Sequence, residues 1–275
     1  MATLAAAMCC SHAPTLLRMR ECHDGGWLRL KQAYERLRAE LARTAPEFVV
    51  VICNDHFDNF FLSAFPTFAL GVAPGYRVAD EGRGGYWNGA FRGHEEAGSV
   101  LARGLVERGF DLTVCYGDME LDHGFALPVS ILGGAAFPPI VPLVVNCVYG
   151  PQPSLTRCWD LGVAIRRTLT ASASPSTYAV LATGGLSHQL VGPNFGMIVE
   201  TFDREFLDVV SGGRRDAIRE WPMAKVLEGG ESATEVANWV VCGGIVGTGV
   251  PGEVLAYEPL PDALTGMAVM RYQVG

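Results

Sequence analysis

The chain has 275 residues, of which 49% are hydrophobic and 18% are charged, and its formal net charge is −8. This composition is typical of a globular chain and excludes intrinsic disorder, and the length suits one large α/β domain over residues 1–275. An acidic chain without a basic stripe is not expected to bind nucleic acid. No apolar run reaches the length of a membrane span, so no membrane partner is expected either.

The cysteines and the N-terminus bear on the compartment. The chain has eight cysteines, and Cys53, Cys115 and Cys147 lie in apolar, strand-like runs where a buried, reduced thiol is the usual form. No C-x-x-C pair occurs, and the apolar start of the chain lacks the positive residues of a signal peptide. We therefore expect a cytoplasmic protein without disulfides or a zinc ribbon.

The first half of the chain alternates strand and helix patterns. A strand over 3–10 is followed by a helix whose apolar residues recur at helical spacing from Trp27 to Leu41, with Asp24 as a candidate N-cap. The run Phe48–Cys53 is wholly apolar and predicts a strand buried on both faces. The glycine-rich segment 71–89 is expected to form a loop or lid, and 90–108 a helix.

The second half continues the alternation. Further strands are expected at 110–116, 140–148 and 178–182, and a short helix should end at Gly133-Gly134. Helices are expected at 155–169, 195–210 and 232–246, and two closing strands at 254–257 and 267–274. Alternation of this kind predicts a single α/β domain with a largely parallel or mixed central sheet flanked by helices.

The histidines collect at predicted strand ends. Of six histidines, His12, His56 and His188 directly follow predicted strands, and His123 lies in the loop after a fourth. Ligands of open α/β sheets bind beyond the carboxyl ends of the strands, so these side chains are expected to meet in one crevice. The remaining two, His23 and His94, lie in polar surroundings and are expected to be solvated surface residues.

A crevice of neutral imidazoles fits a divalent metal, which usually adds a carboxylate ligand. The candidates are Asp55, Asp122, Glu231 and Glu235. A Glu at position 235 precedes an almost entirely apolar helical run, where a carboxylate is costly unless it is paired or bound to metal. Glu231 fits better as a first-turn carboxylate that complements the helix dipole. Two His and one carboxylate form the facial triad of non-haem Fe(II) oxygenases, so the residues predict a candidate metal site at the carboxyl ends of the strands.

Five motifs in order carry a family resemblance across nearly the whole chain. They are Ser11-His12-Ala13-Pro14-Thr15, Asn54-Asp55-His56 with the later Phe65-Pro66-Thr67-Phe68-Ala69-Leu70-Gly71, Asp122-His123-Gly124, Gly184-Gly185-Leu186-Ser187-His188-Gln189, and Thr234-Glu235-Val236-Ala237-Asn238-Trp239. Together they resemble the class III extradiol ring-cleavage dioxygenases, the superfamily of the protocatechuate 4,5-dioxygenase catalytic subunit.

The resemblance implies roles for five residues. His12, His56 and Glu235 would bind Fe(II), His188 would be the acid/base beside the substrate, and His123 would hydrogen-bond to substrate or bound oxygen. The implied partners are an aromatic diol and O2, and the implied product is a ring-opened semialdehyde-type acid, cleaved beside the diol. A homo-oligomer is expected. Either a small partner subunit or the segment 71–89 would close the site.

Several alternatives stay open at this point. The same site could cleave a 2-aminophenol or a dihydroxypyridine, hold zinc for a hydrolase, or belong to a catalytically inactive accessory subunit. The run Gly247–Gly252 matches G-x-G-x-x-G, but it follows a predicted helix and leads into a strand, the reverse of the dinucleotide-binding order. Neither Ser11-His12 nor Ser187-His188 lies in the G-x-S-x-G turn of a serine hydrolase.

Overall fold

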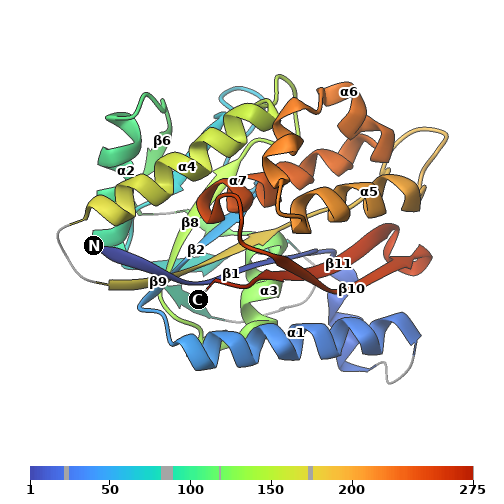
Figure 1. The fold of residues 1–275 in the computed structure, drawn as a ribbon, viewed down its shortest axis with the longest axis horizontal. Coiled ribbons are helices and arrows are strands. Elements are labelled where there is room, and N and C mark those ends of the chain that lie inside the picture. Colours follow the sequence, from blue (N-terminus) through green and yellow to red (C-terminus); the bar gives the residue numbers. More distant parts are fainter. Residues whose placement is uncertain (22–24, 82–88, 118, 173–175, 275) are drawn as a thin grey trace.

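The computed structural model describes residues 1–21, 25–81, 89–117, 119–172 and 176–274. Two sheets are present, one of eight strands and one of three, and helices cover both faces of the larger sheet (Figure 1). This is the mixed α/β architecture that the alternating sequence pattern predicts. No helix in the described ranges has the length and apolar character needed to cross a bilayer.

The large sheet has the order β10-β11-β1-β9-β2-β8-β3-β6. Its strands are β1 (Ala2–Cys10), β2 (Phe48–Cys53), β3 (Phe68–Gly71), β6 (Thr113–Cys115), β8 (Ile140–Val145), β9 (Ser176–Thr183), β10 (Gly252–Leu260) and β11 (Thr265–Tyr272). The central strands β1, β9, β2 and β8 are mutually parallel, whereas β11 and β3 run antiparallel to their neighbours β1 and β8. The parallel centre brings four carboxyl ends to the same edge of the sheet.

The helices form two layers. The α-helices are α1 (Gly25–Thr44), α2 (Glu95–Val106), α3 (His123–Leu132), α4 (Leu155–Ala171), α5 (Glu200–Ser211), α6 (Met223–Val226) and α7 (Val236–Val246). In Figure 1, α1 lies below the sheet and α2, α4, α5 and α7 lie above it. Short 3-10 helices cover Pro14–Arg20, Gly134–Ala136, Arg215–Glu220, Leu227–Gly229, Glu231–Glu235 and Pro261–Ala263.

Strand β2 shows why the sequence of a central strand is a continuous apolar run. All of its residues are buried. Successive side chains of a strand point to opposite faces. Accordingly Val50 and Ile52 pack in the core under α4 and α7, while Val49 and Val51 pack in the core over α1 and α3. Both faces are covered by helices, so neither face of the strand carries a polar residue.

Helices α4 and α7 pack closely through glycines. A side chain at Gly162 would meet the carbonyl oxygen of Val241, and one at Gly244 would meet the carbonyl oxygen of Trp159. Without side chains at these two positions, the backbones of the helices can approach each other. Every residue of α7 is buried, so this helix has a fixed place above the sheet.

The segment around His94 differs from the prediction. A single helix over 90–108 was expected, but Ala90–Arg92 is strand β5, and α2 begins only at Glu95. His94 is the N-cap of α2, where its Nδ1 accepts a hydrogen bond from the Ala97 amide at 3.1 Å, and its ring lies 4.9 Å from that of Phe48. It is therefore a structural cap and not the solvated residue that its polar neighbours predicted.

Other element boundaries also shift. Strand β5 forms the small sheet with β4 (Gly75–Val78) and β7 (Glu120–Leu121), so part of the expected loop 71–89 is a strand. The helix expected at 195–210 begins at Glu200, and the one expected at 232–246 becomes α-helical only at Val236. The candidate N-cap Asp24, the surface residue His23 and positions 82–88 lie outside the described residues.

Candidate metal centre and active site

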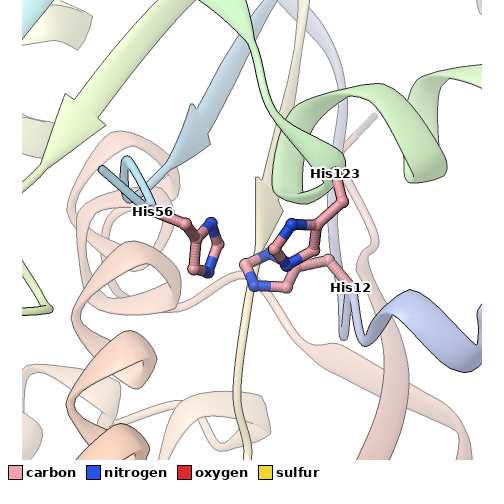
Figure 2. Close-up of side chains that lie close together, drawn as sticks. All are labelled: His12, His56 and His123. Atoms are coloured by element: carbon pink, nitrogen blue, oxygen red, sulfur yellow. The ribbon is translucent and has the colours of Figure 1, made fainter. Parts of the chain in front are cut away.

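The site lies at the carboxyl edge of the parallel strands. His12 follows β1, His56 follows β2, and His188 lies in the loop after β9, where it pairs with Thr265 at the start of β11. His123 comes from a different place: it is the first residue of α3, whose N-cap is Asp122. Figure 2 shows His12, His56 and His123 converging from these separate segments.

The three histidine rings of Figure 2 contact one another. The ring centroids of His56 and His123 are 4.1 Å apart, and that of His12 lies 5.1 Å from His56 and 5.5 Å from His123. One nitrogen from each ring falls within 4.8 Å of one nitrogen from each of the others. Such a cluster of imidazole nitrogens can hold a divalent metal ion.

Hydrogen bonds fix which nitrogen of His12 faces the cluster. Its Nδ1 lies 3.1 Å from Oγ1 of Thr183, and that hydroxyl lies 2.9 Å from the carbonyl oxygen of Gly124. A hydroxyl has one proton to donate, and a carbonyl oxygen only accepts. Thr183 therefore donates to Gly124 and accepts the Nδ1 proton of His12, which leaves the lone pair of neutral His12 on Nε2.

Carboxylates fix which nitrogen of His56 and of His123 faces the cluster. Nδ1 of His56 lies 2.9 Å from Oδ2 of Asp122, and Nδ1 of His123 lies 2.8 Å from Oε1 of Glu81. Each carboxylate also accepts the backbone N–H of the histidine that it holds. Because an ionised carboxylate only accepts, each ring donates from Nδ1 and presents Nε2 as its basic atom.

The carboxylate of Glu235 lies among these Nε2 atoms. Its Oε2 is 3.3 Å from Nε2 of His12, and its Oε1 is 3.3 Å from Nε2 of His56. Asn54 and the backbone N–H of Gly185 donate hydrogen bonds to its two oxygens at 3.1 Å and 2.7 Å. Glu235 is buried and precedes α7 directly, so the fixed position of that helix fixes the carboxylate.

Burial and neighbouring charges shift the pKa values of the site residues. Burial disfavours the ionised form of Glu235, but His12, His56 and His188 outweigh it and hold the pKa of the carboxyl well below its usual range. Burial likewise opposes the charged form of His56, yet Asp122 and Glu235 raise the pKa of that imidazole well above its usual value. Burial lowers the pKa of His123, assisted by His56 and His12 and opposed by Glu81.

His188 lines the same pocket as the histidine cluster. Its Nδ1 donates to the carbonyl oxygen of Leu186 at 2.9 Å, so its Nε2 is the free nitrogen. That atom lies 3.9 Å from Oε2 of Glu235, farther than the nitrogens of His12 and His56. His188 is thus beside the carboxylate without direct contact.

A cavity of about 680 Å³ opens above these side chains. Its wall includes all four site histidines and Glu235. The remaining lining combines residues from the loops after β1, β2, β8 and β9 with the segments before α7 and β11. The volume is within the range of small-molecule sites, and five convergent polar side chains at one end are typical of an active site.

The structure separates the other carboxylate candidates. Asp55 turns back on its own loop, where it accepts hydrogen bonds from Asn59 and from the backbone N–H of Phe60. Asp122 holds His56 and does not reach the free nitrogens. Glu231 lies at the wall of the cavity in the 3-10 helix before Glu235. Of the four candidates, Glu235 is the one in contact with both His12 and His56.

Sequence reasoning missed the residues that orient the histidines. Glu81 lies in the glycine-rich segment, and Thr183 ends β9; neither carries a signal of its own. Asn54 and Asp122 lie in the motifs, and a polar residue beside each motif histidine was the available signal. The seven described cysteines are all free, as expected for a chain without disulfides.

Known proteins resemble this chain over most of its length. A model of the family described as the catalytic LigB subunit of aromatic ring-opening dioxygenase matches residues 6–268. A 2,3-dihydroxyphenylpropionate/2,3-dihydroxicinnamic acid 1,2-dioxygenase of Mycolicibacterium paratuberculosis (strain ATCC BAA-968 / K-10) is 26% identical, over 97% of this chain and 98% of that protein. The enzyme of this name numbered 2 from Pseudomonas putida is 32% identical over 76% of this chain and 63% of its own length.

A solved structure shares the fold. The crystal structure of an uncharacterized protein from Escherichia coli K12 superposes with a TM-score of 0.63 at 13% sequence identity, covering 97% of this chain and 99% of that one. At this identity the likeness concerns the fold alone. The family match over 6–268 includes every site residue described above, and the chain therefore belongs to the family of catalytic subunits of aromatic ring-opening dioxygenases.

Proposed function

We propose that this aromatic ring-opening dioxygenase uses Fe(II) held by His12, His56 and Glu235 to cleave a catechol beside its two hydroxyl groups. The observation that carries the proposal is the convergence of two Nε2 atoms on one carboxylate, 3.3 Å from each. Two imidazoles and one carboxylate on one side of a metal leave open positions for further ligands, the arrangement of non-haem Fe(II) oxygenases.

The donor set fits a divalent cation. The Nδ1 atoms of His12 and His56 are engaged with Thr183 and Asp122, so both rings offer Nε2 in a fixed orientation. Such outer hydrogen bonds orient metal ligands and increase their basicity. Iron bound there would supply the positive charge that lowers the pKa of a coordinated phenol and the redox chemistry with dioxygen.

His188 is proposed as the acid/base. Its Nδ1 proton is held by the Leu186 carbonyl oxygen, which leaves Nε2 facing the cavity to accept a proton from a substrate hydroxyl. The same nitrogen can return the proton when the ring opens. The side chain is far enough from Glu235, at 3.9 Å, to act on a molecule in the cavity and not as a third imidazole ligand.

His123 is proposed as a hydrogen-bonding partner of substrate or oxygen. Its Nδ1 is held by Glu81, and burial first of all, with His56 and His12, lowers its pKa. The ring is therefore neutral at neutral pH and presents an accepting Nε2 to the cavity. A neutral acceptor beside the ligands can take a hydrogen bond from a hydroxyl group of the bound diol.

The substrate class follows from the cavity and the relatives. A volume of about 680 Å³ holds a catechol with a substituent. The related enzymes are named for 2,3-dihydroxyphenylpropionate and 2,3-dihydroxicinnamic acid and as 1,2-dioxygenases. We therefore propose a vicinal aromatic diol as substrate and a ring-opened semialdehyde-type acid as product.

Assembly and compartment belong to the same proposal. Apolar residues at the mouth of the cavity are solvent-exposed, Leu190 by 46% and Leu227 by 48%, which fits a surface covered in an oligomer. We propose a homo-oligomer, with or without a small partner subunit. Buried, free thiols at Cys53 and Cys147 fit a reducing cytoplasm. Light scattering after size exclusion measures the assembly directly.

The test of the function is anaerobic reconstitution. The purified chain is loaded with Fe(II) or, separately, with Zn(II), and O2 uptake and the ring-opened chromophore are recorded with catechol. We expect stoichiometric O2 uptake in the iron form only. If the zinc form instead catalyses hydrolysis of a substrate without O2, and the iron form takes up no O2, the protein is a zinc hydrolase and the proposal is wrong.

A pair of variants tests the ligand set, since the His12, His56 and His123 nitrogens alone form a competing cluster. Glu235→Ala is expected to lose most bound iron, and His123→Ala is expected to retain it. Metal content and the melting temperature are measured on the same preparations. Wild-type iron in the folded Glu235 variant, with iron lost from the His123 variant, would replace Glu235 by His123 in the ligand set.

A further inference from the structure

The cavity wall beyond the site histidines contains two carboxyl groups in addition to the proposed metal ligand. Its described lining includes the carboxyl groups of Glu231 and Asp262 in addition to Glu235, and no lysine or arginine of the described chain is part of it. An anionic group on a substrate would therefore enter a wall of like charge. Like charges brought together in a partly desolvated cavity repel more strongly than in water.

Two hydrogen bonds hold the Glu231 carboxylate in the wall. Its Oε2 accepts from the Gln189 side chain at 3.1 Å, and its Oε1 accepts from the Leu190 backbone N–H at 3.3 Å. Both donors are neutral, so the hydrogen bonds orient the carboxylate without cancelling its charge. Glu231 and Glu235 also bound the same 3-10 helix, which sets Glu231 beside the proposed ligand.

Asp262 neutralises the cation on the outer side of the wall. Nη1 of Arg18 lies 2.6 Å from Oδ2 of Asp262, and the Trp27 indole donates to the same oxygen at 3.0 Å. The Arg18 side chain is 52% exposed and is not part of the cavity lining. The charges of Arg18 and Asp262 thus compensate each other. Of the two carboxyl groups beyond the proposed metal ligand, Glu231 is the one without a cationic partner among the described lining residues.

The rest of this wall is uncharged: it combines apolar residues with the polar Thr15, Gln152, Ser232 and Thr265. Residues from six separate segments contribute apolar side chains: Pro14, Phe57, Val148, Leu190, Leu227 and Leu264. Burial of an alkyl or aryl substituent against such a surface is favourable by about 25 cal/mol per Å² of apolar area. The wall thus offers contacts to an apolar substituent, whereas for a carboxylate its described residues offer neutral polar groups and no cation.

We infer that the substrate is a catechol with an uncharged, apolar ring substituent, and that Glu231 is the specificity residue that disfavours an anionic one. The inference rests on the proposed ring cleavage and concerns only its substrate. In this preference the chain would differ from the relatives named for 2,3-dihydroxyphenylpropionate, a compound that carries a carboxylate.

The test compares matched substrates. The iron-loaded enzyme is assayed with 3-propylcatechol against 3-(2-carboxyethyl)catechol, and with the two 4-substituted counterparts, with unsubstituted catechol as reference. Dissociation constants are measured anaerobically on the same preparation, so that binding is read without turnover. We expect the propyl compounds to be preferred at least about tenfold in both kcat/KM and affinity.

Two further readouts assign the preference to charge. Glu231→Gln should reduce the propyl-to-carboxyethyl ratio at least about fivefold, because it removes one like charge. The control Glu228→Gln, an exposed acid paired with Lys225 and outside the cavity lining, should leave the ratio unchanged. In the wild type the ratio should also fall at high salt, where the screening length shrinks to about 3 Å at 1 M.

The outcomes separate this inference from the function. Equal or better use of the carboxyethyl compounds, with catechol cleaved normally, overturns the inference and leaves ring cleavage standing. A preference that neither Glu231→Gln nor salt changes overturns the role of Glu231. Failure to cleave any catechol in the iron form contradicts the proposed function itself.

Discussion

At the scale of single residues, each imidazole of the site is held at Nδ1 and exposes Nε2. The four holding groups differ: a hydroxyl for His12, carboxylates for His56 and His123, and a carbonyl oxygen for His188. A carboxylate strengthens the basicity of its imidazole more than a neutral acceptor does. The partner of each ring therefore helps to set its chemical role.

The role of His188 can be separated from a structural one. In His188→Gln the side chain keeps a similar reach but cannot carry a proton near neutral pH. We expect iron content and catechol affinity close to wild type and a turnover loss of about a hundred- to ten-thousand-fold, typical of general acid–base groups. All three quantities are measured on one preparation. A normal rate per bound iron would reduce His188 to a structural residue of its loop.

If His56 is a metal ligand as proposed, a metal ion and a proton compete for its Nε2. The raised pKa of this imidazole favours its protonated form in the metal-free protein, and the lowered pKa of Glu235 favours the ionised carboxylate. Metal binding at pH 7 should then release about one proton per site. Calorimetric titration in two buffers of different ionisation enthalpy measures this number.

Asp122→Asn supplies the comparison for that titration. The change removes the charge that raises the pKa of His56, so fewer protons should be released on metal binding. Affinity should fall about 10- to 100-fold, as for other outer partners of metal ligands. Undiminished proton release in this variant would contradict the assignment of the proton to His56.

The sequence predicted which histidines meet but not what holds them. His12, His56 and His188 follow strands that are parallel, and parallel strands bring their ends together, so their convergence could be derived. The partners Thr183 and Glu81 come from distant parts of the chain, and single side-chain hydrogen bonds leave no periodic signal. His94 was assigned to the surface because polar neighbours conceal a capping residue.

At the scale of elements, the contact between α4 and α7 positions Glu235. The first turns of α7 are tied to the loop after β9: Asn238 donates to the Thr183 carbonyl oxygen at 2.9 Å, and Trp239 donates to that of Gly184 at 3.0 Å. The same loop carries Gly185, whose N–H holds the carboxylate. A displacement of α7 would thus move the carboxylate and its hydrogen-bond donors together.

The glycines of this contact provide a test. Gly244→Ala places a methyl group against the Trp159 carbonyl oxygen, and the strain should lower the free energy of unfolding by about 1–3 kcal/mol. Iron affinity should fall as well, because α7 carries Glu235. Gly213→Ala is the control, since open space surrounds that position. Equal stability and iron affinity in both variants would show that the close approach is not required.

The start of α2 shows one limit of predicting helix boundaries from the spacing of apolar residues. The apolar pattern of 90–108 continues across the junction because Phe91 on β5 and Ala97 on α2 are both buried. Spacing alone therefore predicted one helix. Gly93 and the acidic pair Glu95-Glu96 mark the true N-terminus, since acidic residues favour the first turn of a helix. Such capping signals deserve more weight than periodicity at a boundary.

At the scale of the whole molecule, one sheet connects the ends of the chain. Strand β1 pairs with β11 on one side and β9 on the other, so the first and last strands lie side by side in the sheet (Figure 1). We expect the chain over 1–275 to unfold as one cooperative unit. Urea denaturation followed by tryptophan fluorescence and by far-UV circular dichroism should give coincident transitions. Two separated transitions would indicate independently folding parts.

The wide spacing of His12, His56 and Glu235 along the chain has a consequence for the thermodynamics of folding. An unfolded chain presents these side chains far apart, so a metal ion that binds all three binds the native state and has little affinity for the unfolded one. By mass action such a ligand adds about 2.7 kcal/mol of stability at a free concentration one hundred times its dissociation constant. We therefore expect the resistance of this enzyme to heat and proteolysis to depend on its surroundings as much as on its sequence, and to rise and fall with the supply of the metal ion.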